Sequence, residues 1–310
     1  MYTLWLQKNM FNWPIYSRRN LFLLFVFGCS LLGVSQNKRS YTYARKDSKK
    51  LRLDVYTPEH LKKGESLPVV IWMHGGSFSG GERDGATETR FMKYLTKNGY
   101  IGVSISYRLL LKGSKTGFGC NCPASLKKEV FRQAAMDFLD ATKYIIARKK
   151  KLRIDIDKII AGGSSAGAEA VLHAVYLKRF LLDDVKTYAK VNFAGVFALA
   201  GAVMDTSYIY EDNAVPAVLF HGTEDKLVPF GEAPHRYCSE DDSGFLVLNG
   251  SESIANRLHQ LNQSYYLHKV IGGGHEVNHI PYDELDAVFE FFETTLGSGE
   301  TIQTVRSVKK

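Results

Sequence analysis

The sequence predicts an α/β protein with a mostly parallel central sheet and helices on both faces. Apolar runs of strand length alternate with longer segments of helical periodicity over most of the chain. Several of these runs are continuously apolar, which is typical of strands buried on both faces of a parallel sheet. Polar motifs follow the ends of the runs, where such sheets bind their ligands. At 310 residues, the chain suits one large domain.

The first 35 residues are typical of an export signal. A pair of arginines precedes an apolar run over 21–34, which is short for a transmembrane helix. Small residues favour cleavage after Ser35. Two alternatives remain open, namely acylation of Cys29 as in a lipoprotein and retention of the segment as an uncleaved anchor. We expect an exported protein, periplasmic or extracellular, with cleavage favoured over both.

Export makes the remaining cysteines informative. Cys120 and Cys122 follow one predicted strand, and Cys238 follows another. An oxidising compartment favours one disulfide among three thiols. Because both loops should lie at the same edge of the sheet, we expect Cys238 to pair with Cys120 or Cys122. The alternative is three free thiols.

The predicted elements follow from periodicity and turn residues. Strands are expected over 51–56, 67–73, 100–107, 159–161, 192–200, 214–220 and 265–271. Helices are expected over 87–97 and 126–148, after Ala166, after a capping Ser251, and from Pro281 to Gly297. We expect residues 36–297 to form the folded domain and 298–310 to be a polar, mobile tail.

Charge gives little evidence of a macromolecular partner. The net charge is +8, but the basic runs are short and local, and no aromatic residues interleave with them along one face. A nucleic-acid surface needs that arrangement. We therefore expect no nucleic-acid binding.

Residues 163–167 fit the pattern G-x-S-x-G, with Ser165 at its centre. In this pattern a sharp strand-to-helix turn holds the serine hydroxyl clear of the sheet edge, and the glycines remove side chains that would clash. The N–H of Ala166 then lies at a helix N-terminus, where it can stabilise a developing oxyanion. Alone the pattern is weak, because a chain rich in glycine and serine produces it by accident.

Four polar motifs fall at predicted strand ends in an informative order. His-Gly-Gly-Ser at 74–77 follows one strand, and Ser165, Asp225 and His275 follow three later ones. Nucleophile, acid and histidine in that chain order are typical of one hydrolase architecture. Glu224 is the competing acid.

These motifs carry a resemblance to a known family. The matching stretches are Leu-Asp-Val-Tyr-Thr-Pro at 53–58, His-Gly-Gly-Ser-Phe at 74–78, Ser-Tyr-Arg-Leu at 106–109, Gly-Ser-Ser-Ala-Gly at 163–167, His-Gly-Thr-Glu-Asp at 221–225, and Gly-His at 274–275. The chain resembles α/β-hydrolase serine esterases of the carboxylesterase and hormone-sensitive-lipase-like groups. It departs from them at Ser77, where many have a third glycine, and at Ser164, where many have an acid.

The resemblance implies the α/β-hydrolase fold, with a central sheet of about eight strands, and a secreted serine hydrolase of carboxylic esters. Ser165 would be the nucleophile, and His275 would accept its proton, since serine at neutral pH is a poor nucleophile. Asp225 would orient the imidazole and stabilise it when protonated. No cofactor and no metal are expected.

Further residues are expected around this triad. The oxyanion hole should use the backbone N–H groups of Gly76, Ser77 and Ala166. An aromatic cluster of Phe78, Tyr208 and Tyr210 is expected to line the substrate pocket. The substrate should be a small-molecule or carbohydrate-linked ester, while the sequence leaves the acyl group and the oligomeric state open.

Three further functions compete with ester hydrolysis. The stretch His275-Glu-Val-Asn-His279 matches the zinc-protease signature H-E-x-x-H, which requires both histidines on one helix face. Three glycines before it and Pro281 after it leave no room for that helix. The second competitor is a serine peptidase of the prolyl-oligopeptidase type, and the third is a non-catalytic binding protein with the same fold.

Overall fold

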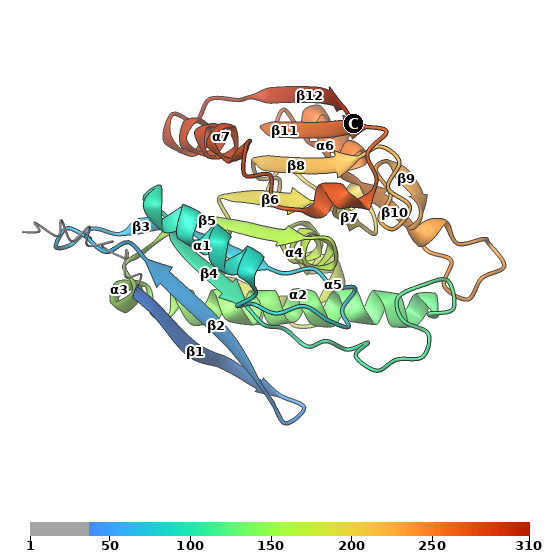
Figure 1. Ribbon diagram of the computed structural model, residues 1–310, viewed down its shortest axis with the longest axis horizontal. Helices are drawn as coiled ribbons and strands as arrows, with labels where there is room; N and C mark the ends of the chain where they lie inside the picture. The colour runs from blue at the N-terminus through green and yellow to red at the C-terminus, as the bar shows by residue number, and fades with distance from the viewer. Residues whose placement is uncertain (1–36) are drawn as a thin grey trace, which may run out of the picture. The chain divides into compact units, whose positions relative to one another are not determined.

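The computed structural model describes residues 37–310, which fold around a nine-stranded sheet (Figure 1). The predicted signal segment, its cleavage site and Cys29 lie outside the described residues. The strand order is β1-β2-β4-β3-β5-β6-β8-β11-β12. The pairings β1–β2 and β2–β4 are antiparallel, and the others are parallel. The predicted mostly parallel α/β sheet is confirmed, with one strand more than the eight expected.

The strands of this sheet are β1 (Asn37–Lys46), β2 (Lys49–Thr57), β3 (Leu67–Met73), β4 (Ile101–Ile105), β5 (Ile154–Ser164), β6 (Gly195–Leu199), β8 (Ala217–Gly222), β11 (Tyr265–Ile271) and β12 (Gln303–Lys309). A small antiparallel sheet contains β7 (Ala202–Val203), β10 (Val247–Gly250) and β9 (Glu232–Pro234). The helices are α1 (Ala86–Lys97), α2 (Ala124–Ile146), α3 (Lys149–Leu152), α4 (Ala166–Tyr176), α5 (Lys178–Leu181), α6 (Ser251–Gln260) and α7 (Leu285–Gly297). Short 3₁₀ turns are η1 (Val185–Tyr188), η2 (Thr206–Tyr208), η3 (His235–Tyr237) and η4 (His275–Asn278).

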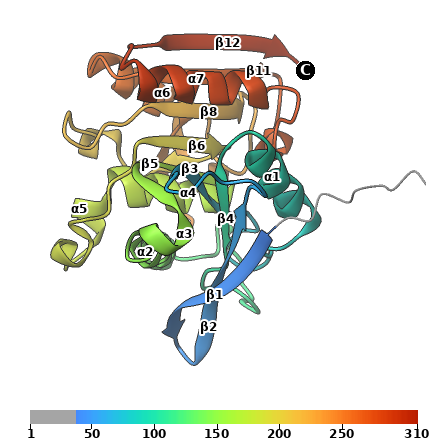
Figure 2. The same ribbon diagram turned by 90° about the vertical axis from the view of Figure 1, so that its left-hand side faces the viewer.

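Helices cover both faces of the sheet, and each face has its own apolar core. Apolar side chains of α1 and α7 pack with Trp72 and Phe197 on one face. Those of α2, α4 and α6 pack on the other face with Ile71 and Ala161. Strand residues that are neighbours in sequence therefore point into different cores, as the continuous apolar runs predicted. Figure 2 shows the helices on either side, with β12 and the β1–β2 hairpin at the two edges.

Two sequence predictions were wrong in detail. The predicted tail 298–310 forms β12, which extends the sheet in parallel beside β11. Its two valines among polar residues suit an edge strand that is largely exposed, which composition does not distinguish from a tail. Ser251 is the first residue of α6 rather than its cap, and Gly250 occupies the cap position.

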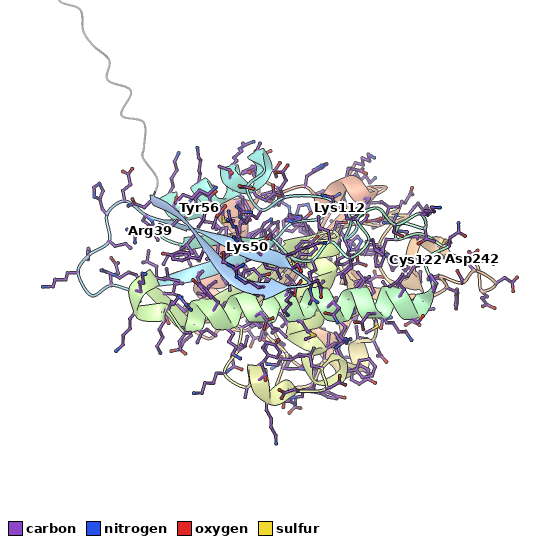
Figure 3. All side chains as sticks on the ribbon, turned by 90° about the horizontal axis from the view of Figure 1, so that it is seen from below. Arg39, Lys50, Tyr56, Lys112, Cys122 and Asp242 are labelled. Carbon is purple, nitrogen blue, oxygen red and sulfur yellow. A yellow bond between two sulfur atoms is a disulfide. The ribbon has the colours of Figure 1, made fainter. Side chains whose placement is uncertain are left out.

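A disulfide joins Cys120 to Cys238, which confirms the predicted pairing of Cys238, and Cys122 is a buried free thiol. It links the loop 109–123 to the loop 231–246, and backbone hydrogen bonds from Gly244 to Cys120 and from Ala124 to Ser243 join the same loops. Figure 3 labels Cys122 and Asp242 near one end of α2, in the region of these loops. Within residues 37–310, we find no helix that is both long and apolar enough to span a bilayer.

Candidate active site

A strained turn between β5 and α4 presents Ser165. Its backbone has φ 51° and ψ −123°, a conformation that side-chain-bearing residues rarely adopt. The Ser165 N–H donates to the Leu199 carbonyl at 2.8 Å, which fixes the turn against β6. A Cβ on Gly167 would lie 2.1 Å from the Met73 carbonyl oxygen, so only glycine lets α4 start so close to β3.

Ser165, His275 and Asp225 converge at the carboxyl ends of β5, β11 and β8. Ser165 Oγ lies 2.8 Å from His275 Nε2, and His275 Nδ1 lies 2.7 Å from Asp225 Oδ2. A carboxylate only accepts, so Nδ1 carries the proton and donates to Asp225, which leaves Nε2 free to accept the Ser165 hydroxyl proton. This is the geometry that a serine needs to become a nucleophile through a histidine base.

Asp225 is buried in a site that favours its ionised form. Its Oδ1 accepts hydrogen bonds from the N–H groups of Leu227 and Val228 at 2.8 and 3.0 Å. Burial acts to raise the pKa of Asp225, but the hydrogen bonds from His221 and His275 outweigh it and hold the pKa below its usual range. The competing acid, Glu224, has an exposed side chain on the same turn.

A second histidine supports Asp225, and no sequence motif indicated this role. His221 is fully buried, and its Nε2 donates to the Val228 carbonyl at 3.0 Å while lying 3.4 Å from Asp225 Oδ2. Ser251 Oγ donates to His221 Nδ1 at 2.8 Å. The Ser251 hydroxyl, which was predicted to cap α6, therefore orients His221 beside Asp225 instead.

Ser164 and Asn278 hold the turn that carries His275. Ser164 Oγ donates to the Asn278 carbonyl at 2.8 Å, and the Asn278 side-chain amide donates to the His275 carbonyl. Ser164, which stands where many members of the similar family have an acid, thus links the turn that carries Ser165 directly to the turn that carries His275. Nothing in the sequence pointed to Asn278.

The loop after β3 lies against the nucleophile. A Cβ on Gly75 would lie 3.2 Å from Ser165 Cβ, so the loop backbone passes in contact with the serine. Gly76 has φ +117°, and Ser77 has φ 50°. Gly76 and Ser77 line the same cavity as Ser165, and Ala166 begins α4 with its N–H unpaired within the helix. All three predicted oxyanion residues therefore lie beside the serine.

The cavity that contains Ser165 and His275 has a volume of about 550 Å³, and many of its lining side chains are polar or charged. Its lining beyond the triad includes the following residues from the β3–α1 connection, α1 and the histidine turn: His74, Glu82, Thr87, Glu88, His279 and Ile280. His74 is buried, its Nδ1 donates to the Gly75 carbonyl at 2.7 Å, and burial lowers its pKa. It supports the loop rather than acting as a base.

The predicted aromatic cluster does not line this cavity. Phe78 is fully buried, with its ring 5.0 Å from Phe118 and 5.8 Å from Phe131 in the core. Tyr208 stacks on Phe180 at 4.2 Å, and Tyr210 is exposed beside α5 and α6. The prediction was wrong because proximity in sequence to a motif does not indicate which face a side chain occupies. Polar side chains from the connection before α1 line the cavity instead.

The H-E-x-x-H stretch does not form the helix that a zinc site of that type needs. Residues 275–278 form the 3₁₀ turn η4, and His279 leaves it in an extended conformation. Within the described part of the chain, the one grouping of cysteine and carboxylate groups compact enough for a metal is Cys120, Cys238 and Asp242, whose sulfurs are joined in the disulfide.

Comparison with known proteins agrees with this architecture. The family model BD-FAE matches residues 53–201. Fumonisin B1 esterase of Sphingopyxis macrogoltabida is 29% identical over 39% of the chain and 22% of its own length. A secreted lipase of Arthroderma benhamiae is 26% identical over 51% of the chain and 32% of its own length. The matched part thus spans a third or less of these curated relatives.

Solved structures extend the similarity to most of the chain. Thermogutta terrifontis esterase 2 phosphorylated by paraoxon superposes with a TM-score of 0.61 over 84% of the chain and 94% of its own, at 16% identity. Identity this low carries the fold alone. The chain has the α/β-hydrolase fold, and over residues 53–201 it is similar to the BD-FAE family.

Proposed function

We propose that the protein is a serine esterase that cleaves carboxylic esters through an acyl-enzyme on Ser165. The observation that carries the proposal is the pair of contacts Ser165 Oγ–His275 Nε2 at 2.8 Å and His275 Nδ1–Asp225 Oδ2 at 2.7 Å. Relatives named esterase and lipase, and a structural neighbour phosphorylated by paraoxon, support the same chemistry.

The reaction has two halves. Ser165 Oγ attacks the ester carbonyl carbon as its proton passes to His275 Nε2, and Asp225 stabilises the resulting imidazolium. The N–H groups of Gly76, Ser77 and Ala166 stabilise the tetrahedral oxyanion. The alcohol leaves with the proton from His275 and an acyl-enzyme remains. Water then attacks the acyl carbon, gives a proton to His275, and the acid leaves as Ser165 regains its hydrogen.

We propose a polar ester as the substrate, either a small molecule or one linked to carbohydrate. The cavity beside Ser165 offers the carboxylates of Glu82 and Glu88 and the imidazole of His279, which can accept hydrogen bonds from alcohol hydroxyls. A long acyl chain would leave these groups unpaired, which is unfavourable.

We also propose that the protein is exported, with cleavage of the signal after Ser35 favoured. The Cys120–Cys238 disulfide supports an oxidising compartment. Relatives named secreted lipases in Arthroderma benhamiae and Gibberella zeae agree with this. Detection of the mature N-terminus by mass spectrometry tests it, and a lipidated Cys29 would contradict the cleavage site.

Four reagents test the activity. A short-chain p-nitrophenyl ester should be hydrolysed, paraoxon should abolish that hydrolysis, and EDTA should leave it unchanged. A peptide anilide should be cleaved far more slowly than the ester. Loss of activity in EDTA would overturn the proposal in favour of a metal-dependent reaction, and preferential cleavage of the anilide would favour a serine peptidase.

A further inference from the structure

A single side-chain contact holds the outer end of the oxyanion loop. Arg236 Nη2 donates to Ser77 Oγ at 2.9 Å, which joins the loop after β3 to the 3₁₀ turn η3. The two residues are 159 positions apart in the chain. Ser77 also supplies one of the amides proposed for the oxyanion hole.

Both partners of this contact lie in strained turns. Ser77 and Phe78 have φ values of 50° and 56°, and Arg236 and Tyr237 have 60° and 53°. Side-chain-bearing residues disfavour this left-handed region, so pairs of them persist only where their surroundings hold them. Phe78 is held by the aromatic core, whereas the Ser77 side chain has Arg236 as its hydrogen-bond partner.

The backbone of Arg236 is held on two sides. Its N–H donates to the Leu227 carbonyl at 3.2 Å, and Leu227 lines the cavity with Ser165. Two residues further on, Cys238 is tied to Cys120 by the disulfide. The positive charge of Arg236 also lies near enough to buried Glu169 to lower its pKa against the larger, raising effect of burial. The backbone that carries the guanidinium is therefore held in place before a substrate arrives.

We propose that Arg236 is a positioning residue for the esterase reaction, which sets the Ser77 amide toward the oxyanion by holding the Ser77 hydroxyl. The inference rests on the proposed function. It assigns Arg236 no contact with the substrate. Because an oxyanion donor works only at the correct distance, a loosened Ser77 turn should slow the chemical step and leave substrate binding largely intact.

A double-mutant cycle tests this through kcat and KM. Arg236→Met and Ser77→Ala should each lower kcat roughly 10- to 100-fold with KM changed less than about twofold, as expected for a misplaced donor. The double variant should be no slower than the slower single variant, because both remove one interaction. Arg236→Lys, which keeps a charge and one donor, should recover part of the loss.

Arg153→Met is the matched control. Arg153 also has a left-handed backbone, with φ 62°, and its Nε donates to the Glu65 carbonyl at 2.8 Å, away from the cavity. The Arg153→Met variant should leave kcat unchanged. Losses in the Arg236 and Ser77 variants that multiply, or a kcat for Arg236→Met equal to that of the wild type, would overturn the inference alone. A wild-type chain that neither hydrolyses the ester nor reacts with paraoxon would overturn the proposed function as well.

Discussion

The two sides of Ser165 are held in place by different means. On the histidine side, Asp225 has its acceptor positions filled by two backbone N–H groups and His275, and Ser164 ties the turn that follows. On the oxyanion side, the N–H groups of Ser79 and Gly80 donate to the Gly76 carbonyl, and the Ser77 side chain has one hydrogen bond, from Arg236. The histidine side is a network of side-chain hydrogen bonds around the triad, whereas the oxyanion loop is held mainly through its backbone and the Ser77 side chain has one hydrogen bond, to Arg236.

Behind that contact lies a group of buried polar atoms without partners. Glu169 Oε1, both ring nitrogens of His235 and Arg236 Nε make no hydrogen bond within the described residues. Glu169 and His235 are nearly fully buried, 3.5 Å apart at their closest polar atoms. The proton-transfer groups are therefore fully hydrogen-bonded, while the region that supports the oxyanion loop contains unfavourably buried groups whose ionisation depends on pH.

The largest effect is expected at Ser165, the proposed nucleophile, which lies between the two sides. Ser165→Ala should lower kcat roughly 10⁴- to 10⁶-fold, because it removes the acyl-enzyme route and leaves only binding and oxyanion contacts. Steady-state hydrolysis of a p-nitrophenyl ester measures this. Ser164→Ala is the neighbouring control and should lose far less activity than Ser165→Ala, since Ser164 supports the histidine turn through Asn278 and makes no hydrogen bond to the triad side chains. A reversed order would move the nucleophile to Ser164.

The second effect concerns the histidine side. Asp225→Asn should lower kcat on the order of 10⁴-fold, because an amide in place of the carboxylate favours the wrong imidazole tautomer. Glu224→Gln changes the adjacent, exposed acid and should leave kcat within about twofold on the same ester. A large loss at Glu224 beside a small one at Asp225 would exchange their roles.

The smallest effect concerns the stability of the region behind the oxyanion loop. Burial raises the pKa of Glu169 to about 8, above its value in the unfolded chain. The folded state therefore binds an extra proton between about pH 4.5 and pH 8, and the stability this gives is complete at low pH and is lost as the pH rises through 8. Glu169→Gln should remove this dependence.

Urea unfolding measures that difference. Relative to the wild type, Glu169→Gln should gain on the order of 1–3 kcal/mol in the free energy of unfolding between pH 5 and pH 8. Glu232→Gln, at an exposed glutamate, should show no such gain. Equal pH dependence in the wild type and Glu169→Gln would show that Glu169 stays ionised in the folded protein.

Much of the fold could be predicted from local pattern. The continuous apolar runs predicted β3, β6, β8 and β11, and helical spacing predicted α1, α2 and α7 to within a few residues of their bounds. The disulfide followed from where two loops must meet. The edge strands β1 and β12 were not predicted, because exposed strands lack the apolar signal that marks buried ones.

The residues of the candidate site also fall into those that local pattern predicted and those that it did not. Ser165, Asp225 and His275 were found because each ends a predictable strand within a recognisable motif. His221, Asn278 and Arg236 were missed because their roles depend on contacts with residues that are distant in the chain, and no spacing rule describes such contacts. Phe78 was misplaced because a left-handed turn sends its ring into the core.

The proposed esterase reaction requires that Ser165, activated by His275, form the covalent bond with the substrate acyl group. Reaction of the protein with paraoxon, followed by peptide mass spectrometry, identifies the residue that forms it. We expect one diethyl phosphoryl group on Ser165, and no labelling in a His275→Ala variant under the same conditions. Labelling of Ser164 or of a residue outside the cavity, or rapid labelling that does not need His275, would contradict the proposed mechanism.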